Sequence, residues 1–196
     1  MTKPSIVREL KTQIWILLSV LGLLWVIHGV NTFLFQGQLV LFGIRPRQVG
    51  GLWGILFAPL LHGNFSHLIA NTVPLLTLGW LVMLQTTVDF LVVTAIAMGV
   101  SGFGTWLIGA STSVHIGASG VIFGYFGFLL LRGYFERSAI AIAISLLVMG
   151  FYGSLLWGVL PNQPGVSWEG HLFGFVGGAI AARLLSQRPT RPDYDS

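Results

Sequence analysis

The sequence predicts an all-α integral membrane protein, a bundle of six membrane-spanning helices. Of its 196 residues, 54% are hydrophobic and only 8% are charged, and the mean hydropathy is +0.82, whereas soluble domains carry about 25% charged residues. Long uncharged stretches recur, and a helix of about 20 apolar residues crosses a hydrocarbon core of about 30 Å. The length suits one membrane domain with no second folded domain. The absence of cysteine excludes disulfides and thiolate sites.

Uncharged runs and helix-breaking residues place the six expected spans. Residues 14–35 form the first span; a cleaved signal peptide is the alternative, but the apolar stretch is too long and no small-residue cleavage site follows it. Glycines and Pro59 interrupt 36–64, which is expected to be a membrane-associated first outer loop. The polar run "STS" at 111–113 is the expected turn between the third and fourth spans. The other spans are expected at 66–85, twice within 90–131, at 140–160 and at 168–185.

The basic residues indicate how these spans are oriented. With six spans and a cytoplasmic N-terminus, eight of the ten Lys and Arg residues fall inside, and only Arg45 and Arg47 fall outside. We therefore expect a multi-pass protein of the bacterial plasma membrane with both termini in the cytoplasm. The expected organisation is a cytoplasmic segment at 1–12, the six-span domain at 13–186 and a disordered, Pro-rich cytoplasmic tail at 187–196.

Few polar side chains interrupt the spans, and those few gather toward the outer side of this topology. His67 and Asn71 lie at i and i+4 on one face of the second span, Ser119 lies in the fourth, and His171 lies near the outer end of the sixth. Such residues are costly in lipid unless they are hydrogen-bonded or face the bundle interior, so they are functional candidates. Each of these residues, taken alone, could simply form a hydrogen bond between packed helices. Their common depth on three helices favours a shared site.

Repeated small-xxx-small patterns predict that the fourth and sixth spans pack closely. His171, Gly174 and Gly178 fall at i, i+3 and i+7, which puts the histidine on the same face as the glycines. Either pattern alone is explained by helix packing, but close packing would also bring His171 toward Ser119. The glycines are Gly117, Gly120, Gly124 and Gly127 in one segment, and Gly170, Gly174 and Gly178 in the other.

Ser119 and His171 together predict nucleophilic catalysis. A serine hydroxyl needs a base within about 3 Å to take its proton, and imidazole titrates near neutrality. Glu169 is two residues from His171 and does not share its helix face, so the sequence indicates a dyad rather than a triad. The oxyanion would be bound by the Ser119 amide and the side chains of His67 and Asn71. A soluble-hydrolase nucleophile elbow is excluded, because "GASG" is not GxSxG and no strand precedes it.

The motifs "HGNFSHLIAN", "GASG" and "GHLFG" have the order, spacing and span positions of the rhomboid intramembrane serine proteases, which the chain resembles from about 43 to 185. The resemblance implies a six-helix bundle whose short fourth span lifts the serine to a water-filled cavity open to the outside. It implies Ser119 as nucleophile, His171 as general base, and His67, Asn71 and the Ser119 amide as the oxyanion hole. The expected supporting residues are His62, Gly117, Gly120, Phe123 and Gly174.

Two positions depart from the family pattern. Many bacterial rhomboids have a tyrosine that stacks on the catalytic histidine, and Phe123 stands at that position. Its ring can stack but cannot donate a hydrogen bond. The Trp-Arg pair common in the first outer loop of the family is not apparent, and Arg45-Pro46-Arg47 and Trp53 lie nearby instead.

Two further histidines are expected to have no part in the chemistry. His28 lies in the first span without a polar partner on that span, so it is expected to be a packed or interfacial residue. His115, four residues before Ser119, is expected to be a solvated loop residue rather than a second base.

The sequence therefore predicts an endopeptidase that cleaves transmembrane helices near the outer leaflet through an acyl-enzyme. Its expected partners are transmembrane protein substrates and membrane lipids, with no nucleic acid, metal or cofactor. The alternative is a rhomboid-like pseudoprotease that binds transmembrane helices as a chaperone or retention factor, and the presence of both Ser119 and His171 argues against it. A small transporter is less favoured, because the polar groups gather at one end and no intramembrane carboxylate is expected on a path through the middle of the membrane.

Overall fold

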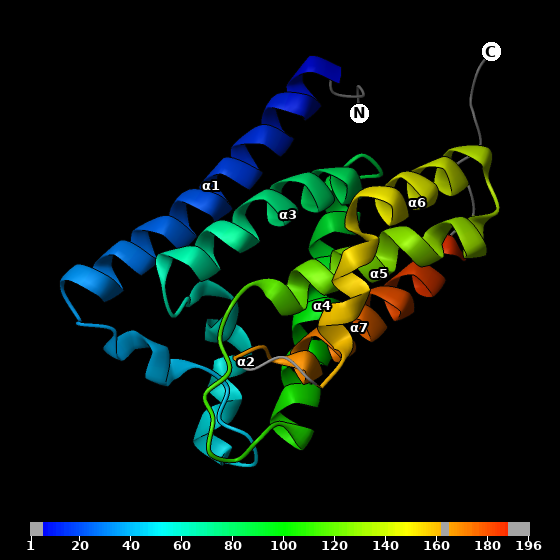
Figure 1. The fold of residues 1–196 in the computed structure, drawn as a ribbon. Helices are drawn as coiled ribbons and strands as arrows, with labels where there is room; N and C mark the ends of the chain where they lie inside the picture. The colour runs from blue at the N-terminus through cyan, green and yellow to red at the C-terminus, as the bar shows by residue number, and fades with distance from the viewer. Residues whose placement is uncertain (1–5, 162–164, 188–196) are drawn as a thin grey trace.

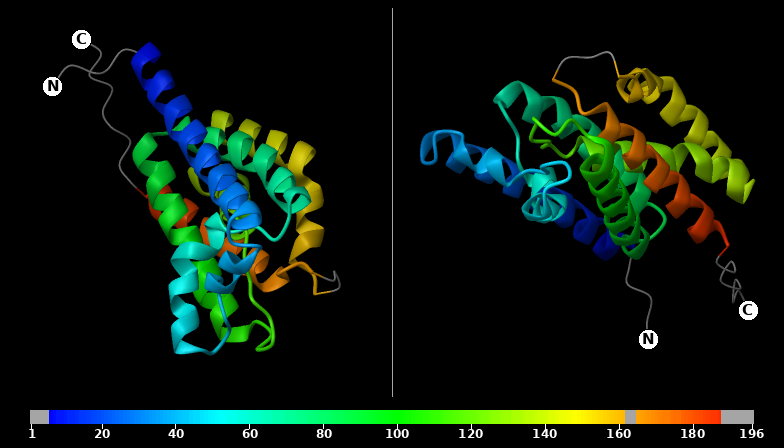
Figure 2. Two further views of the ribbon diagram at one scale, coloured as in Figure 1. Left: turned by 90° about the vertical axis from the view of Figure 1, so that its left-hand side faces the viewer. Right: turned by 90° about the horizontal axis from the view of Figure 1, so that it is seen from below.

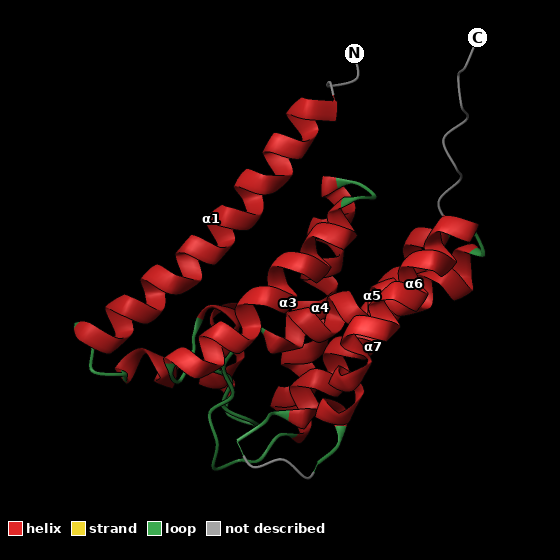
Figure 3. Cartoon of the chain, turned by 45° about the horizontal axis from the view of Figure 1, so that its top comes forward, coloured by secondary structure: helices red, strands yellow, loops and turns green. Residues whose placement is uncertain are grey.

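The computed structural model describes residues 6–161 and 165–187. The described residues are all-helical, as predicted, and the one pairing of extended segments among them joins Ile44 and His115 (Figures 1 and 3). The long helices are α1 (Ile6–Phe33), α3 (Phe65–Met83), α4 (Thr87–Ile108), α5 (Ser119–Glu136), α6 (Ala139–Tyr152) and α7 (Trp168–Ser186).

Polar side chains immediately before several helices explain where those helices begin. Asn64 accepts a hydrogen bond from the His67 amide at 2.8 Å and so caps α3. Ser138 accepts one from the Ala141 amide at 3.2 Å and caps α6. Each cap satisfies a backbone N–H that has no carbonyl partner within the first turn. The cap at Asn64 fixes the start of the helix that carries His67 and Asn71.

The segment between α1 and α3 is a chain of short helical turns. These are η1 (Gln38–Phe42), η2 (Val49–Trp53), α2 (Gly54–Phe57) and η3 (Ala58–Leu60). Pro59 lies in the first turn of η3, where its missing N–H is tolerated. The glycines and the proline that predicted a broken segment thus lie within these turns.

Two connections differ from the sequence-based expectation. The turn expected at 111–113 is a longer loop at 109–118, because Gly109 ends α4 and Gly117 has a φ of +114°, which does not fit a right-handed helix. Ser119 is consequently the first residue of α5. The stretch 140–160 is not one continuous α-helix: α6 ends at Tyr152 and a 3₁₀ helix, η4 (Gly153–Val159), follows.

Helix α5 lies at the centre of the bundle and packs most extensively against α7. A Cβ atom on Gly174 would lie 2.1 Å from the Gly120 carbonyl oxygen, and one on Gly178 would lie 2.0 Å from that of Gly124. Side chains at these positions would therefore collide with the facing backbone. The predicted close packing along the glycine faces of these two helices is confirmed.

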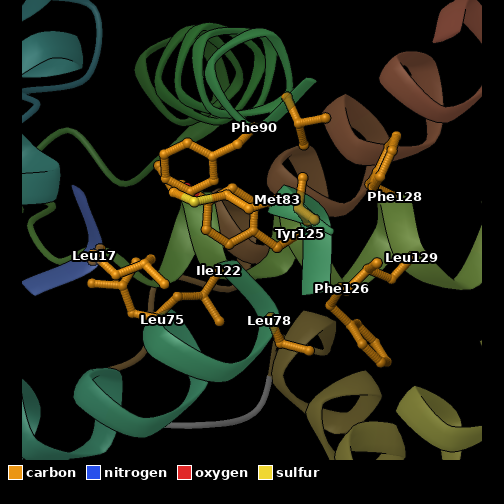
Figure 4. Packing of buried hydrophobic residues seen from close by; sticks show 14 of the residues in the cluster. Leu17, Leu75, Leu78, Met83, Phe90, Ile122, Tyr125, Phe126, Phe128 and Leu129 are labelled. Atoms are coloured by element: carbon orange, nitrogen blue, oxygen red, sulfur yellow. The ribbon is translucent and has the colours of Figure 1, made fainter. Parts of the chain in front are cut away.

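Large aromatic side chains fill the core on the other sides of α5. Tyr125, Phe126 and Phe128 are almost completely buried. Phe90 of α4 approaches Tyr125 with ring centroids 5.6 Å apart (Figure 4). Because aromatic side chains bury the largest apolar areas, this cluster stabilises the position of α5, the helix that begins at Ser119.

Four of the described helical segments are long and apolar enough to cross a membrane: α1, α3, α4 and α6 taken together with η4 (Ala139–Val159). Sequence reasoning expected six. Helices α5 and α7 fall outside this set; they carry charged residues such as Arg132 and Arg183, and their glycines face neighbouring helices. Helix α1 lies at the edge of the bundle beside α3 (Figure 2). In Figure 3 the start of α1 and the end of α7 lie at one end of the bundle, opposite the loops 34–64 and 109–118.

Candidate active site

A cavity of about 730 Å³ lies between the starts of α3, α5 and α7. His67 and Asn71 line it from α3, Ser119 from α5 and His171 from α7. The structure thus brings together the four polar residues that the sequence singled out, although they are separated by up to about a hundred positions along the chain.

Ser119 occupies the N-terminus of α5. As the first helical residue, its N–H has no carbonyl partner within the helix, and the helix dipole favours negative charge at this end. No hydrogen bond joins the Ser119 hydroxyl to the His171 ring in this structure. Such bonds are often long before substrate binds, and both side chains line the same cavity.

The His171 ring is held by two contacts. Phe123 stacks on it with a centroid distance of 4.0 Å and an interplanar angle of 6°, as the sequence predicted. Its Nδ1 lies 2.9 Å from the carbonyl oxygen of Gly158. A carbonyl can only accept, so Nδ1 carries the hydrogen, and Nε2 of the neutral ring keeps the lone pair that a general base requires.

Gly158, in η4, was not identified from the sequence. A Cβ atom at this position would lie 2.8 Å from Cζ of Phe123 and 3.2 Å from Nδ1 of His171, so a side chain would displace the ring pair. The acceptor is a backbone carbonyl, which no residue type reveals. The only signal was a glycine in "LLWGVLP", where an uninterrupted span was expected.

The other side of the cavity carries hydrogen-bond donors. A Cβ atom on Gly117 would lie 2.7 Å from Nε2 of His67 and 3.7 Å from Nδ2 of Asn71, so both side chains converge on the backbone two residues before Ser119. The amide nitrogen of Asn71 is buried without a hydrogen-bond partner in the described residues. An unpaired buried donor is costly, and Asn71 is one of the residues that line the cavity.

Ser101 of α4 is a second residue that sequence reasoning missed. Its hydroxyl donates to the Gly170 carbonyl at 2.8 Å and so ties α4 to the start of α7. A Cβ atom on Gly120 would lie 2.2 Å from the Ser101 Oγ. Gly120 therefore leaves room for a hydrogen bond beside the candidate nucleophile.

His62 and His28 support the loop before α3. The His62 carbonyl accepts a hydrogen bond from the His28 ring at 3.2 Å, and the His62 ring meets that of His67 edge-on at 5.0 Å. Burial, with smaller contributions from the rings of His67 and His28, lowers the pKa of His62 to about 4, so this ring is neutral at physiological pH. His28 is buried and packs against Phe65, as expected for a packed residue.

His115 is not the solvated loop residue that was expected. It is half-buried, with Nε2 2.8 Å from Oγ of Ser113 and Nδ1 2.7 Å from Oγ of Ser167. The prediction was wrong because its second partner, Ser167, lies 52 positions away and caps α7. No group of His, Cys, Asp and Glu within 6–161 and 165–187 is arranged to hold a metal ion.

The fold and the cavity define a helical membrane protein with a serine and a histidine at the ends of two packed helices. Comparison with known proteins gives the family. The model of the rhomboid domain matches residues 49–188, so the chain belongs to the rhomboid family and is an integral membrane protein.

The relatives extend over most of the chain. An uncharacterized protein of Mycobacterium tuberculosis is 46% identical over 178 residues, which cover 87% of this chain and 74% of the relative. One of Mycobacterium leprae is 43% identical over 191 residues, covering 85% of this chain and 76% of the relative. A Bacillus subtilis protein named "Putative rhomboid protease YdcA" is 29% identical over 184 residues, covering 92% of this chain and 90% of its own.

Proposed function

We propose that this protein is an intramembrane serine endopeptidase that cleaves transmembrane-helix substrates near the outer leaflet by a Ser119–His171 dyad. The observation that carries the proposal is the state of His171. Its Nδ1–H is bonded to the Gly158 carbonyl, which leaves Nε2 as an acceptor in the cavity that Ser119 also lines. A serine is a useful nucleophile only beside such a base. Membership of the rhomboid family supports the same chemistry.

In the proposed first half-reaction, Ser119 Oγ attacks the carbonyl carbon of the scissile peptide while Nε2 of His171 takes the hydroxyl proton. The carbonyl oxygen becomes an oxyanion. It accepts hydrogen bonds from the Ser119 N–H and from the side chains of His67 and Asn71. His171 then returns the proton to the leaving amine nitrogen, the C–N bond breaks, and an acyl-enzyme ester on Ser119 remains.

In the second half-reaction a water molecule replaces the amine. His171 takes its proton as the water oxygen attacks the ester carbonyl, and the same donors bind the second oxyanion. The proton passes to Ser119 Oγ as the ester bond breaks, which releases the carboxylic acid and restores the hydroxyl. The cavity supports this step because about 730 Å³ is far more than one water molecule requires.

The proposed topology has six crossings with both termini in the cytoplasm. The long helices α1, α3, α4, α5, α7 and the stretch Ala139–Val159 would be the spans. The distribution of Lys and Arg supports this orientation. It would place the cavity in the outer half of the membrane, within reach of single-span substrates that have helix-destabilising residues near the cut and a small residue before it.

Active-site labelling tests the proposal. The purified protein in detergent is incubated with a fluorescent fluorophosphonate, beside Ser119→Ala and beside Ser186→Ala, a serine control at the other end of α7 from the cavity. We expect the probe to modify the wild type and Ser186→Ala but not Ser119→Ala, because only an activated serine reacts with it. Absence of labelling and of substrate cleavage, with retained binding of transmembrane helices, would instead identify a pseudoprotease.

A further inference from the structure

His115 is a half-buried titratable residue that the proposed mechanism does not use. Its backbone pairs with Ile44 in both directions, with N to O distances of 2.9 Å. Its side chain reaches across to Ser167, which accepts from the Gly170 amide and caps α7. One residue therefore connects the outer loop, the segment before α5 and the start of α7.

The hydrogen atoms of this cluster have one arrangement that satisfies every group. The Ser113 hydroxyl donates to the Ala110 carbonyl at 2.7 Å, so Ser113 Oγ can accept from Nε2–H of His115. Burial lowers the pKa of His115, although the Glu169 carboxylate acts in the opposite direction, and the ring is neutral. Nδ1 then has a lone pair and accepts the hydrogen of the Ser167 hydroxyl.

The position of this bond relates it to the candidate dyad. Ser119 follows His115 by four residues, and His171 follows Ser167 by four. The glycine contacts between α5 and α7 include Gly120, on which a Cβ atom would lie 3.4 Å from the Gly170 carbonyl oxygen, and continue at Gly174 and Gly178 away from the cavity. They join one helix to the other and do not involve the loop segment that precedes Ser119. In the described residues, the hydrogen bond between His115 and Ser167 is the link that joins the segment before Ser119 to the cap of the helix that carries His171.

We propose that the His115–Ser167 hydrogen bond is a clasp that sets the separation of Ser119 and His171, which makes His115 a positioning residue for the reaction. This inference rests on the proposed function of the dyad. Without the clasp, the segment that leads into Ser119 is no longer tied to the Ser167 cap of α7, although the two helices remain packed along their glycines. Displacement of reacting groups by about 1 Å costs about 100-fold in rate. We therefore expect loss of the clasp to lower kcat and to leave substrate binding unchanged.

Two substitutions of His115 separate its two arms. The amide of His115→Asn reaches the position of Nδ1 and keeps a partner for Ser167, whereas that of His115→Gln reaches the position of Nε2 and keeps only the partner for Ser113. With a reconstituted transmembrane substrate, we expect His115→Gln to lose about 10-fold to 100-fold in kcat with little change in KM. His115→Asn should retain most of the wild-type kcat. Equal kcat values for the two variants would overturn the proposal.

A second pair keeps the proposal testable if the His115 variants fail to fold. Ser167→Thr keeps the hydroxyl. Ser167→Val gives a side chain of nearly the same shape as threonine but without the hydroxyl. We expect Thr to support cleavage and Val to lose kcat by a similar factor to His115→Gln. Wild-type kcat in Ser167→Val would overturn the clasp.

One measurement separates failure of the clasp from failure of the proposed protease activity. Nitrogen-15 NMR of histidine-labelled Ser119→Ala, which is expected not to cleave, should show His115 as the neutral Nε2–H tautomer at pH 7. The signal is assigned by its loss in a variant that also carries His115→Asn. A protonated His115 or the Nδ1–H tautomer would overturn the clasp whatever the protein cleaves. Wild-type cleavage by Ser119→Ala would overturn the dyad, and with it the role of the clasp in catalysis.

Discussion

His171 and His67 line one cavity from different helices, but their rings are restrained in different ways. His171 is stacked on Phe123 and hydrogen-bonded to the Gly158 carbonyl. The His67 ring meets the edge of the His62 ring, and its nitrogens have no hydrogen bond to any described residue. Asn71, one turn further along the same helix, likewise has an unpaired amide nitrogen.

The difference matches the two proposed roles. A general base must present one nitrogen in the right tautomer before substrate arrives, so its other nitrogen and its ring plane are fixed in advance. An oxyanion donor is useful only if it is free when negative charge develops, so it gains from having no internal partner. The fixed ring of His171 and the unpaired donors of His67 and Asn71 therefore each suit the role proposed for them.

The largest expected effect is on the dyad itself. Ser119→Ala and His171→Ala should each reduce kcat to background, a loss on the order of 10⁶ where nucleophile and base act as a unit. The double variant should be no worse than either single variant, because the losses do not add. Cleavage of a reconstituted transmembrane substrate measures this, with circular dichroism as the control for folding. Substantial cleavage by purified Ser119→Ala would rule out the proposed nucleophile.

The donors on α3 should have smaller effects. Removing one donor from an oxyanion hole costs about 10² to 10³ in kcat, and three donors can partly compensate for one another. We expect His67→Ala and Asn71→Ala to keep some activity and the double variant to be worse than either. The loss should appear in kcat rather than KM, since the charge exists only in the transition state. Wild-type rates for both single variants, in detergent and in lipid, would show that these residues only contribute to helix packing.

The smallest effects are expected at the stacked ring. Phe123→Tyr keeps the aromatic face and should be tolerated, whereas Phe123→Ala leaves the His171 ring with one restraint, the Gly158 carbonyl. A loss of about 10-fold to 100-fold in kcat is expected for the alanine variant, because the base is then misplaced. Comparable kcat values for wild type, Tyr and Ala would show that stacking does not orient the base.

Much of this site could be predicted from the sequence because side-chain identity carries it. A helical period of 3.6 residues placed His67 and Asn71 on one face, and small residues at every fourth position placed α5 against α7. These arguments require only spacing within a helix, so they held. The all-helical fold followed from hydropathy in the same way.

What could not be predicted depends on irregular backbone and on contacts distant in sequence. The carbonyl of Gly158 reaches His171 because α6 is followed by a 3₁₀ helix. A hydropathy pattern does not distinguish a 3₁₀ helix from an α-helix. The start of α5 at Ser119 depends on the positive φ of Gly117. His115 has an ordinary loop context in the sequence, and its partner Ser167 becomes visible only when α7 is packed against α5.

The acceptor for Nδ1 of His171 is a carbonyl oxygen, whereas the best-known serine hydrolases use a carboxylate. A carboxylate carries a full charge, and burying it among apolar helices would cost several kcal/mol unless it is compensated. A carbonyl orients the ring without adding a net charge to the bundle. In the proposed mechanism, the imidazolium formed during each proton transfer would be stabilised by a dipole rather than by an anion, which would favour its return to the neutral ring.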